Sequence, residues 1–555
     1  MKLKKVLATV MSIALFAAAL TGCGSSDTSG SFNDGYADNV FRVAIASDIE
    51  TADVQLSTAD YTLPINLYDT LVEVKTLDDG TSEIEGSLAE DWEISDDGLV
   101  YTFHLRQGVL FSNGEELEAD DVLYTIDRMA NPERLAKNTD CMDMIKGVQD
   151  MLDGKIDTVE GVGVEIIDKY TVAITLEQAY APFLANLCVP GFSIYNREAG
   201  DAADEAGDGI QSSKFGVDPE YTVGTGPFTL KEWKVNDHIY LEANENYWKG
   251  TPSIDGVLIT VVPDNDTRKM MFENGEIDLY DLDYAREQIP YYTESEEYKD
   301  RIISKPRLST YYYSINENIE PFQDVRVRKA VQMAINRQEI LDTLYASAGE
   351  VANGIFPPGL IAYNEELDEI PYDPEAAKEL LEEAGYPDGF EMEITQTTDS
   401  TDTLSLNELV QSQLAEVGIK VTINQMDEAT WLDVRSNGEL PMYQTVWSAD
   451  FNDPDNFIYT FFSPENTVAR SFNYYNTEAM EKVVEARFMT DEDERIEAYQ
   501  ELEKEIIQDD AAWIPLFHLQ HLWVKSERLK SYTPHWAGWS EANYWDVELD
   551  VSDAE

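Results

Sequence analysis

Hydrophobic and polar residues alternate along the body of the chain with two different periods. Period 2 predicts a strand at 41–45 and a hairpin at 92–106, where two alternating runs flank the turn Asp96-Asp97-Gly98. Apolar residues spaced three and four apart predict a helix at 119–129, whereas the small polar residues 199–214 predict a surface loop. The same criteria predict helices at 63–74 and 266–273 and strands at 162–167, 170–176, 228–233 and 252–262.

The C-terminal half has another rhythm, in which helices and strands alternate. Its predicted elements are strand 310–315, helix 325–334, helix 374–384, strand 390–395, helix 404–417 and strand 420–424. Gly385 and Gly418 each separate a helix from the strand that follows it. This order is typical of an α/β lobe with a largely parallel sheet. An acidic stretch at 477–507 predicts further helix, and residues 513–524 return as a strand.

The N-terminus carries a targeting signal. Three lysines precede the apolar run 6–20, which is too short to span a membrane and is typical of a signal peptide. The Leu-Thr-Gly-Cys sequence that follows resembles the bacterial lipoprotein box, which implies removal of residues 1–22 and acylation of Cys23. The alternative is an ordinary signal peptide with a chance cysteine. Residues 23–39 are expected to be the lipidated cysteine and a flexible tether at the outer face of the bacterial cell membrane.

Charge and motif content exclude several classes of function. The chain has 39 Lys and Arg against 108 Asp and Glu, a net charge of −69, which disfavours nucleic acid and anionic lipid headgroups as partners. His518 and His521 fall on opposite faces of a predicted strand, so they do not form a metal pair. The sequence contains no HExxH, G-x-S-x-G or P-loop motif, and the acidic cluster 450–455 lacks the central glycine of an EF-hand. We therefore predict no catalytic residue, metal site or cofactor.

The chain has only three cysteines, which excludes a disulfide-rich scaffold. Besides Cys23 these are Cys141 and Cys188. Their spacing leaves two possibilities open, a disulfide between them or two separately buried thiols.

Several sequence blocks, in order along the chain, carry a family resemblance. They are GSLAEDW at 86–92, YTFHLR at 101–106, FSNGE at 111–115, DDV at 120–122, GTGPF at 224–228, NENYWKGTP at 244–252, TYYYSIN at 310–316, PF at 321–322 and DVRVRK at 324–329. Together they resemble the dipeptide-, oligopeptide- and nickel-binding family (family 5) of ABC-importer extracellular solute-binding proteins. The set is most similar to oligopeptide-binding lipoproteins, and the likeness extends from about residue 42 to the C-terminus.

The resemblance implies an α/β fold of the periplasmic-binding-protein type (class II, large form), with two lobes and a ligand cleft between them. Lobe I is expected to combine residues 40–75, 214–304 and 521–555, with an inserted subdomain at 76–213. Lobe II is expected at 305–520. The implied partners are short peptides, an ABC permease with its ATPase subunits, and the membrane through the lipid anchor, with the binding protein itself a monomer.

The resemblance also implies ligand-binding residues. In peptide-binding members the aspartate after Trp-x-Ala pairs with the α-ammonium of the ligand, and this position is Asp450 here. The alternative is that Asp450 caps the turn before Pro454. Trp447 is expected either beside the ligand or in the core.

The resemblance implies further candidates. Thr58 and Tyr61 lie in a segment that is similar in position to a family loop whose main chain can pair with an extended peptide. Tyr313 shares a strand face with Tyr311, and we expect that face in the cleft rather than in the core. Arg435 is similar in position to an arginine that reaches a peptide carboxylate. Two positions depart from the family pattern: Gln444 stands where an arginine also meets the carboxylate, and Glu428 replaces a tryptophan.

These observations predict a non-enzymatic substrate-binding lipoprotein of an ABC transporter, which captures short peptides between its lobes. One alternative is the same fold with a non-peptide cargo such as a nickel chelate, haem or an oligosaccharide. Another is a peptide-sensing receptor or a tethered hydrolase that has kept the binding fold.

Overall fold

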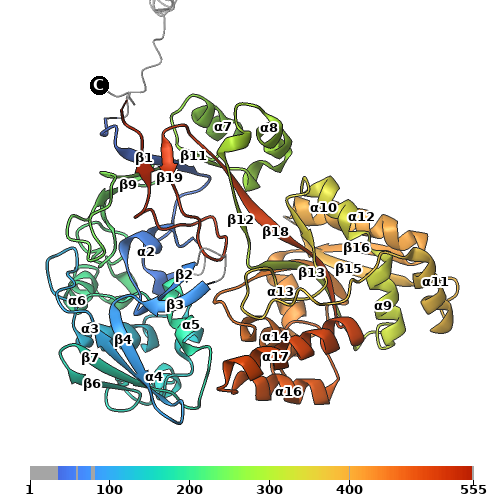
Figure 1. Cartoon of the computed structure of the whole chain (residues 1–555). Helices are drawn as coiled ribbons and strands as arrows, with labels where there is room; N and C mark the ends of the chain where they lie inside the picture. Colours follow the sequence, from blue (N-terminus) through green and yellow to red (C-terminus); the bar gives the residue numbers. More distant parts are fainter. Residues whose placement is uncertain (1–34, 58–59, 77–81, 399, 553–555) are drawn as a thin grey trace, which may run out of the picture.

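The computed structural model describes residues 35–57, 60–76, 82–398 and 400–552, so Cys23 and Thr58 lie outside the described residues. The described chain forms two lobes of mixed helices and sheets (Figure 1). The blue and teal N-terminal part of the chain builds one lobe, and the yellow and orange elements of the C-terminal half build the other. The predicted two-lobed α/β architecture is confirmed.

The sheet of the first lobe has the strand order β1-β10-β9-β8. These strands are β1 Val40–Ile45, β10 Gly256–Val261, β9 His238–Ala243 and β8 Phe228–Lys234. Strand β1 runs parallel to β10, whereas β9 is antiparallel to both of its neighbours. Helix α2 (Thr62–Leu67) contacts β8, and a core that includes Phe41, Leu63 and Ile259 joins helix and sheet.

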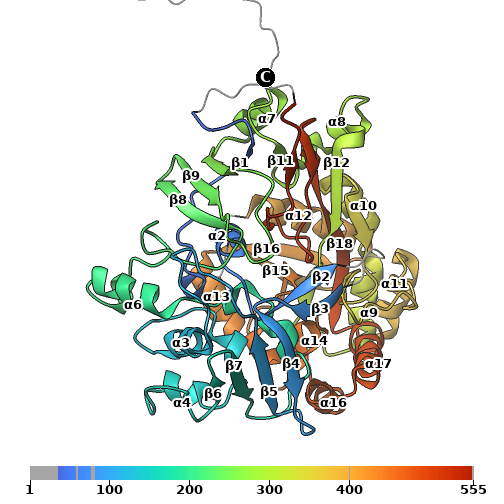
Figure 2. The same cartoon turned by 60° about the vertical axis from the view of Figure 1, so that its left-hand side comes forward.

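A second sheet forms an inserted subdomain below the first (Figure 2). Its order is β4-β5-β7-β6, all antiparallel, with β4 Ala89–Ile94, β5 Val100–Leu105, β7 Thr171–Thr175 and β6 Val164–Asp168. Helix α3 (Ala119–Ala130) begins with a reciprocal capping box between Glu118 and Asp121 and buries its apolar face against this sheet. The other elements here are β2 Val72–Thr76, β3 Ser82–Gly86, α4 Val148–Leu152, α5 Phe183–Leu187 and α6 Arg197–Ala206.

The second lobe is built on β17 (Met442–Ser448), β13 (Ser309–Ile315) and the first part of β18 (Trp513–Lys525). Strand β13 lies between the other two and is antiparallel to both. A parallel pair of strands, β15 Glu391–Thr397 and β16 Lys420–Met426, lies beside β17. The helices of this lobe are α9 Val325–Ala334, α10 Arg337–Leu344, α11 Pro374–Glu383, α12 Thr401–Glu416, α13 Glu428–Ser436, α14 Asp455–Phe462, α15 Asn466–Ala469, α16 Thr477–Arg487 and α17 Glu492–Glu503.

Strand β18 runs between the two lobes. Its first part pairs with β13 and with β14 (Gly349–Val351), and its last part pairs with β12 (Ile302–Pro306) and β11 (Leu279–Asp281). Figure 1 shows β12 and β18 side by side between the lobes. The remaining elements lie at the β11 end or in the C-terminal tail: α7 Asn265–Glu273, α8 Ile289–Glu294, β19 Leu529–Ser531 and β20 Glu548–Leu549. The lobe boundaries expected at 305 and 520 remain a prediction.

Most predicted elements are confirmed, but the prediction of a loop at 199–214 is wrong in its first half. Helix α6 occupies Arg197–Ala206, and the side chain of Asn196 caps it by accepting a hydrogen bond from the backbone of Ala199. Gly200 lies so close to the Tyr124 ring that a Cβ atom would clash, and Ala203 is fully buried. Small residues mark this helix because it packs closely against its neighbour.

The helix predicted at 63–74 is too long. Helix α2 ends at Leu67, and β2 begins at Val72. Asp69 lies in between, and its buried carboxylate accepts hydrogen bonds from Thr225, Tyr247 and Trp248. A buried carboxylate needs such partners, and they come from distant segments that local periodicity does not reveal.

The predicted largely parallel sheet in the second lobe is also wrong. Among the described strands of this lobe, only β15 and β16, which helix α12 connects, form a parallel pair, whereas β13 is antiparallel to β17 and β18. The helix–glycine–strand pattern therefore describes the β15–α12–β16 unit and not the whole lobe. Strand β18 enters from a distant part of the chain, so its direction does not follow from that pattern.

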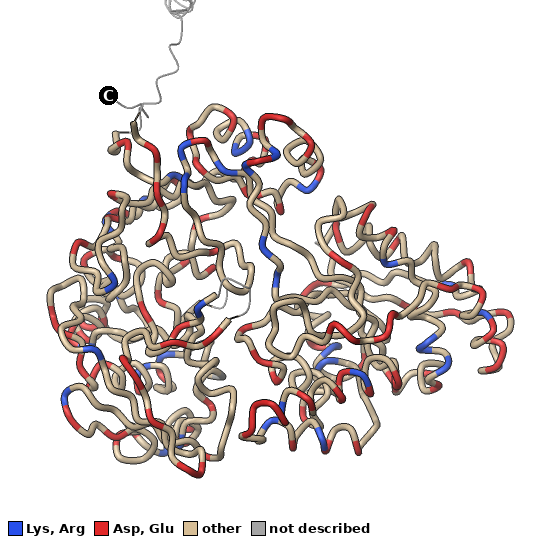
Figure 3. Tube along the Cα trace, viewed as in Figure 1, with Lys and Arg blue, Asp and Glu red and all other residues tan. Residues whose placement is uncertain are grey.

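Acidic residues occur along the chain in both lobes, with basic residues scattered among them (Figure 3). The excess of acidic residues that gives the net charge of −69 is therefore not confined to one lobe.

Candidate ligand-binding cavity between the lobes

A cavity of about 630 Å³ lies between the inserted subdomain and the second lobe. Its volume is within the range of small-molecule sites. The first lobe and its insert contribute Tyr61, Asn138, Cys141, Asp143, Met144, Gln178, Tyr180, Asn186, Val189, Pro190 and Gly191. The second lobe contributes Trp447, Asp450, Phe451, Asp455, Asn456, Tyr459, Thr460, Glu465, Asn466, Arg470, Arg487 and Phe488, and the C-terminal tail adds Trp539.

Asp450 lines this cavity from the loop that connects β17 to α14, and the residue is exposed. Asn456 positions it: the Asp450 backbone N–H donates to Asn456 Oδ1 (2.9 Å), and Asn456 Nδ2 donates to Asp450 Oδ2 (3.0 Å). The turn before α14 is capped by Asp453, whose Oδ1 accepts from the backbone of Asp455 (2.8 Å). The carboxylate of Asp450 is therefore held at the cavity wall.

Trp447 precedes this loop on β17 and contacts both the core of the second lobe and the cavity. Its Nε1 donates to the Asn456 carbonyl (2.8 Å), and its ring packs edge-on against the buried Phe461. The ring is only half-buried and also lines the cavity. Trp447 thus joins the core of the second lobe to the cavity wall.

Tyr61 lines the cavity from the opposite lobe. Its ring stacks on Trp539, with the ring centroids 5.6 Å apart. Sequence analysis predicted Tyr61 as a ligand-binding residue but did not identify Trp539. These two rings face the second lobe because the tail folds back over α2, where Asn66 Nδ2 donates to the Ala542 carbonyl (2.9 Å).

Tyr313 does not line the cleft, contrary to expectation. Its side chain is fully buried, and its hydroxyl donates to Asn407 Oδ1 (2.6 Å). Strand β13 is central in its sheet and is covered by helices on both faces, so Tyr312 and Tyr313 are both buried although they point in opposite directions. Tyr311 and Tyr313 do share a face of the strand, as predicted. The alternation of side chains along a strand does not reveal which face of the sheet is exposed to solvent.

Arg435 is not among the lining residues of the cavity. It lies in the last turn of α13, with its guanidinium 5.2 Å from the centre of the Trp431 ring. Gln444 lines a second, smaller cavity, of about 340 Å³, together with Tyr311 and Arg286. Glu428 is exposed in the first turn of α13.

Two arginines that sequence reasoning missed also line the cavity. The guanidinium of Arg470 lies over the rings of Trp447 (4.8 Å) and Phe461 (5.2 Å). That of Arg487 lies over Tyr459 (3.9 Å), and its Nε is 3.7 Å from Asp455 Oδ2. Neither belongs to a recognisable motif, so only the three-dimensional contacts identify them.

The other acidic residues of the β17–α14 loop are bound within the protein. Both Asp453 oxygens pair with the Arg495 guanidinium (2.5 and 2.8 Å), and Asp455 accepts hydrogen bonds from Tyr499 (2.9 Å) and Tyr180 (3.2 Å). Burial raises the pKa of Asp455 to about 6, and the charge of Arg487 opposes this rise. These carboxylates already have partners, unlike the open ligand set of an EF-hand.

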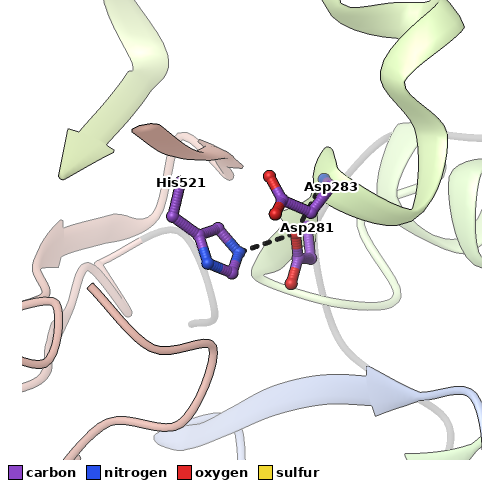
Figure 4. Close-up of side chains that lie close together, drawn as sticks. All are labelled: Asp281, Asp283 and His521. Atoms are coloured by element: carbon purple, nitrogen blue, oxygen red, sulfur yellow. Dashed lines mark hydrogen bonds and ion pairs between the residues drawn. The ribbon is translucent and has the colours of Figure 1, made fainter. Parts of the chain in front are cut away.

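One cluster in the described chain has the composition of a metal site: Asp281, Asp283 and His521, whose candidate ligand atoms all lie within 4.8 Å of one another. Figure 4 shows His521 Nε2 directed at Asp281, at a distance of 2.9 Å. Arg307 forms an ion pair with Asp283 and places its Nη2 2.9 Å from His521 Nδ1. A guanidinium therefore already balances the charge that a metal ion would balance. His518 instead directs Nδ1 at the Ser309 carbonyl (3.2 Å), which confirms that the two histidines point apart.

The two cysteines that the structure describes are not joined to each other. The Cys141 thiol donates to the Asn138 carbonyl (3.0 Å), and the Cys188 thiol donates to the Leu184 carbonyl (3.3 Å). Of the two possibilities left open by their spacing, the structure has two separate thiols.

Within the described ranges no helix is both long enough and apolar enough to cross a membrane.

Comparison with known proteins gives a consistent picture. The family model for bacterial extracellular solute-binding proteins, family 5, matches residues 83–469. The chain is 33% identical to haem-binding protein A of Haemophilus influenzae, covering 84% of each chain. It is 31% identical to the dipeptide-binding protein of Escherichia coli, covering 82% of this chain and 84% of the relative. Among solved structures it is similar to the ABC transporter-associated periplasmic binding protein DppA from Helicobacter pylori in complex with the peptide STSA, with a TM-score of 0.71, 29% identity and coverage of 92% of this chain and 98% of that one. From its fold, its sequence blocks and these similarities, the chain belongs to family 5 of the bacterial extracellular solute-binding proteins.

Proposed function

We propose that this protein captures short peptides in the cavity between its lobes and delivers them to an ABC permease for import. The observation that carries the proposal is the exposed carboxylate of Asp450 in an interlobe cavity of about 630 Å³. The similarity to a dipeptide-binding protein and to a peptide-bound structure supports it. Binding proteins of this family are not enzymes, and capture and release require no bond to be made or broken.

The recognition chemistry follows from what all linear peptides share. Each carries an α-ammonium group, whatever its side chains are, so one fixed carboxylate gives affinity without sequence preference. Asn456 holds both the backbone and the carboxylate of Asp450, which reduces the entropy lost when the ammonium binds. Thr58 and Arg435 stay in the proposal only as secondary contacts.

Strand β17 offers a second mode of contact. It lies at the edge of its sheet, paired with β13 on one side. An edge strand can accept an extended peptide through main-chain hydrogen bonds, which again do not depend on side chains. Trp447 from β17 and Tyr61 from the opposite lobe would then enclose the peptide from two sides.

Lobe closure couples binding to transport. The cavity wall comes from both lobes, so a ligand that contacts both favours the closed arrangement. The strands β12 and β18 that run between the lobes are where bending would be absorbed. We propose that the division into lobes follows the boundaries at about 305 and 520.

Asp450→Asn tests the proposal. It keeps the shape of the side chain but removes the charge, so peptide affinity should fall about 10- to 100-fold, the value of one hydrogen bond between charged groups. Isothermal titration with a defined tripeptide measures the change, and Asp433→Asn, at an exposed position of α13, is the matched control.

Native mass spectrometry of the protein purified without added ligand should also show a mixture of short peptides. Unchanged peptide affinity of the Asp450→Asn variant would show that Asp450 does not bind the ligand. A single non-peptide mass would show that the cargo is not a peptide.

We further propose that Cys23 carries the lipid that anchors the protein to the outer face of the membrane. The Leu-Thr-Gly-Cys sequence supports this proposal. Two acyl chains on one residue give stable attachment where one chain does not. Cys23→Ser should move the protein from the membrane fraction into the medium or periplasm, whereas an ordinary signal peptide would leave the distribution unchanged.

A further inference from the structure

A third cavity, of about 260 Å³, adjoins the interlobe cavity on the side of the first lobe. Tyr61 and Trp539 line the interlobe cavity, and their neighbours in the chain, Asp60, Ser540 and Glu541, line the third one. The two cavities therefore lie on either side of the same two short segments. A volume of about 260 Å³ is below the usual range for a whole ligand, but it suits one long side chain of a larger ligand.

Aromatic rings form much of the wall of the third cavity. These rings belong to Tyr280, Tyr284, Trp523, Tyr532 and Tyr544. Tyr284 is exposed, whereas Tyr544 is buried, so the rings extend from the surface into the protein. Aromatic rings pack well against the aliphatic stem of a lysine or arginine, and their faces attract its positive charge.

Three carboxylates line the same space, those of Asp60, Asp281 and Glu541. Asp60 and Glu541 are half-buried. The backbone N–H of Thr62 donates to Asp60 Oδ1 (3.1 Å), which holds this carboxylate in place. Asp281 Oδ1 lies 2.9 Å from His521 Nε2 and so already has a partner. Asp60 and Glu541 are therefore the two carboxylates on which a ligand would depend most.

The charges of these carboxylates reach the aromatic wall. Burial, followed by the charges of Asp60 and Glu541, raises the pKa of Tyr544. Burial, followed by the charges of Asp281, Glu541 and Asp60, also raises the pKa of Tyr284. The rings and the carboxylates thus share one region of negative potential, which favours a cation.

The protein supplies little positive charge to this region. Among the described residues that line the cavity, Arg268 is the basic one, and its guanidinium donates to the Val262 carbonyl (2.6 Å) and to Asn265 Oδ1 (3.2 Å). Within the described part of the chain, neither Asp60 nor Glu541 forms an ion pair. Three carboxylates against one guanidinium leave the cavity with an excess of negative charge.

The Tyr532 hydroxyl is an independent sign of an incomplete site. It is buried in the wall of the cavity and has no hydrogen-bond partner among the described residues. A buried hydroxyl without a partner costs free energy, so such groups are uncommon. An ammonium group has three N–H donors and can therefore bind this hydroxyl and a carboxylate at the same time.

We infer that the third cavity is a subsite for a basic side chain, so that the preferred cargo is a peptide with a lysine or arginine at one fixed position. The inference rests on the proposed function and narrows its substrate class. Asp60 and Glu541 bind the charged end through charge-assisted hydrogen bonds, and the rings contact the aliphatic stem. Asp450 takes no part in this subsite, because it lines the interlobe cavity.

The test uses tetra-alanine in which each residue in turn is replaced by lysine or by norleucine. Norleucine has the aliphatic stem of lysine without the ammonium, so the ratio of the two affinities isolates the charge. High salt screens the general attraction of an acidic protein for any cation. Titration calorimetry on the wild-type protein should find lysine preferred at least about tenfold at one position and less than about threefold at the others.

Two variants assign that preference to the cavity. Glu541→Gln and Asp60→Asn should each lower the lysine-to-norleucine ratio at the preferred position by about fivefold or more. Both should leave the affinity for the norleucine peptide within about threefold. Asparagine suits position 60, where the backbone φ is +61°, because it tolerates this conformation better than most residues.

Two controls make the outcome specific to the cavity. Glu548→Gln removes the same charge from an exposed position of the same C-terminal tail, outside the cavity lining, and should leave every ratio unchanged. Thermal unfolding of each variant reports any loss of folded protein.

The two levels of the proposal fail differently. A ratio below about threefold at every position, an equal preference for lysine at every position, or a ratio that Glu541→Gln and Asp60→Asn leave unchanged would overturn the basic subsite. Binding of tetra-alanine itself would then leave peptide capture intact. No binding of any member of the series, or of a mixed peptide library, would overturn the proposed function.

Discussion

The loop after β17 and the cluster around His521 are both rich in carboxylates, and both adjoin strands of one sheet. In the cluster Arg307 pairs with Asp283, and Asp281 contacts His521. The two loop carboxylates differ: Asp453 forms an ion pair with Arg495, whereas Asp450 lines the cavity. In a chain with 108 acidic residues, composition does not distinguish these cases. What distinguishes the two loop carboxylates is burial: Asp453 is buried against Arg495, whereas Asp450 is exposed at the cavity wall.

The largest expected effect comes from breaking the internal pair in the loop. Arg495→Met leaves Asp453 buried without its cation, and such an uncompensated buried charge costs about 3–5 kcal/mol in the free energy of unfolding. Chemical denaturation followed by tryptophan fluorescence measures the change. A cost below about 1 kcal/mol would mean that water reaches Asp453, and the contrast with Asp450 would be lost.

A smaller effect should appear in the pH dependence of stability. The raised pKa of Asp455, about 6 against an ordinary 3.8, means that the folded protein binds this proton more tightly than the unfolded chain does. The contribution of Asp455 to stability should therefore be greatest below about pH 4 and decline as the pH rises to about 6, by up to about 3 kcal/mol.

The measurement compares unfolding free energies of the wild type and Asp455→Asn between pH 4 and 7. The asparagine does not titrate, so the difference between the two proteins isolates this residue. Parallel profiles would show that Asp455 is ionised throughout the range.

The smallest effect is expected where the carboxylate faces the ligand. Asp450→Asn should change the free energy of unfolding by no more than about 0.5 kcal/mol, because the residue is exposed and an asparagine can still accept from Asn456 Nδ2. Thermal unfolding without ligand checks this. A large loss of stability would make Asp450 a structural residue and remove the basis of the comparison.

Much of the fold could be predicted from the sequence. The hairpin of β4 and β5, the amphipathic helix α3 and the returning strand β18 are confirmed, because each depends on side-chain period and on turn residues close in the chain. The errors share one cause. Helix α6, the early end of α2 and the antiparallel direction of β13 all depend on partners that are distant in sequence.

The candidate site divides in the same way. A short motif pointed to Asp450 and Trp447, and the structure places both at the cavity wall. No motif pointed to Arg470 or Trp539, and Tyr313 was assigned to the cleft although it lies in the core.

The sequence by itself determined the family, the order of most secondary structure elements and one acidic position in the cleft, since these follow from local patterns and ordered blocks of residues. Only the tertiary structure decided which charged side chains line the cavity. It brings Tyr61 against Trp539 and sets Arg470 on Trp447, contacts between residues that are far apart in the chain. The physical reason is that a charge is neutralised by its neighbours in space, and these neighbours are chosen by the packing of whole lobes.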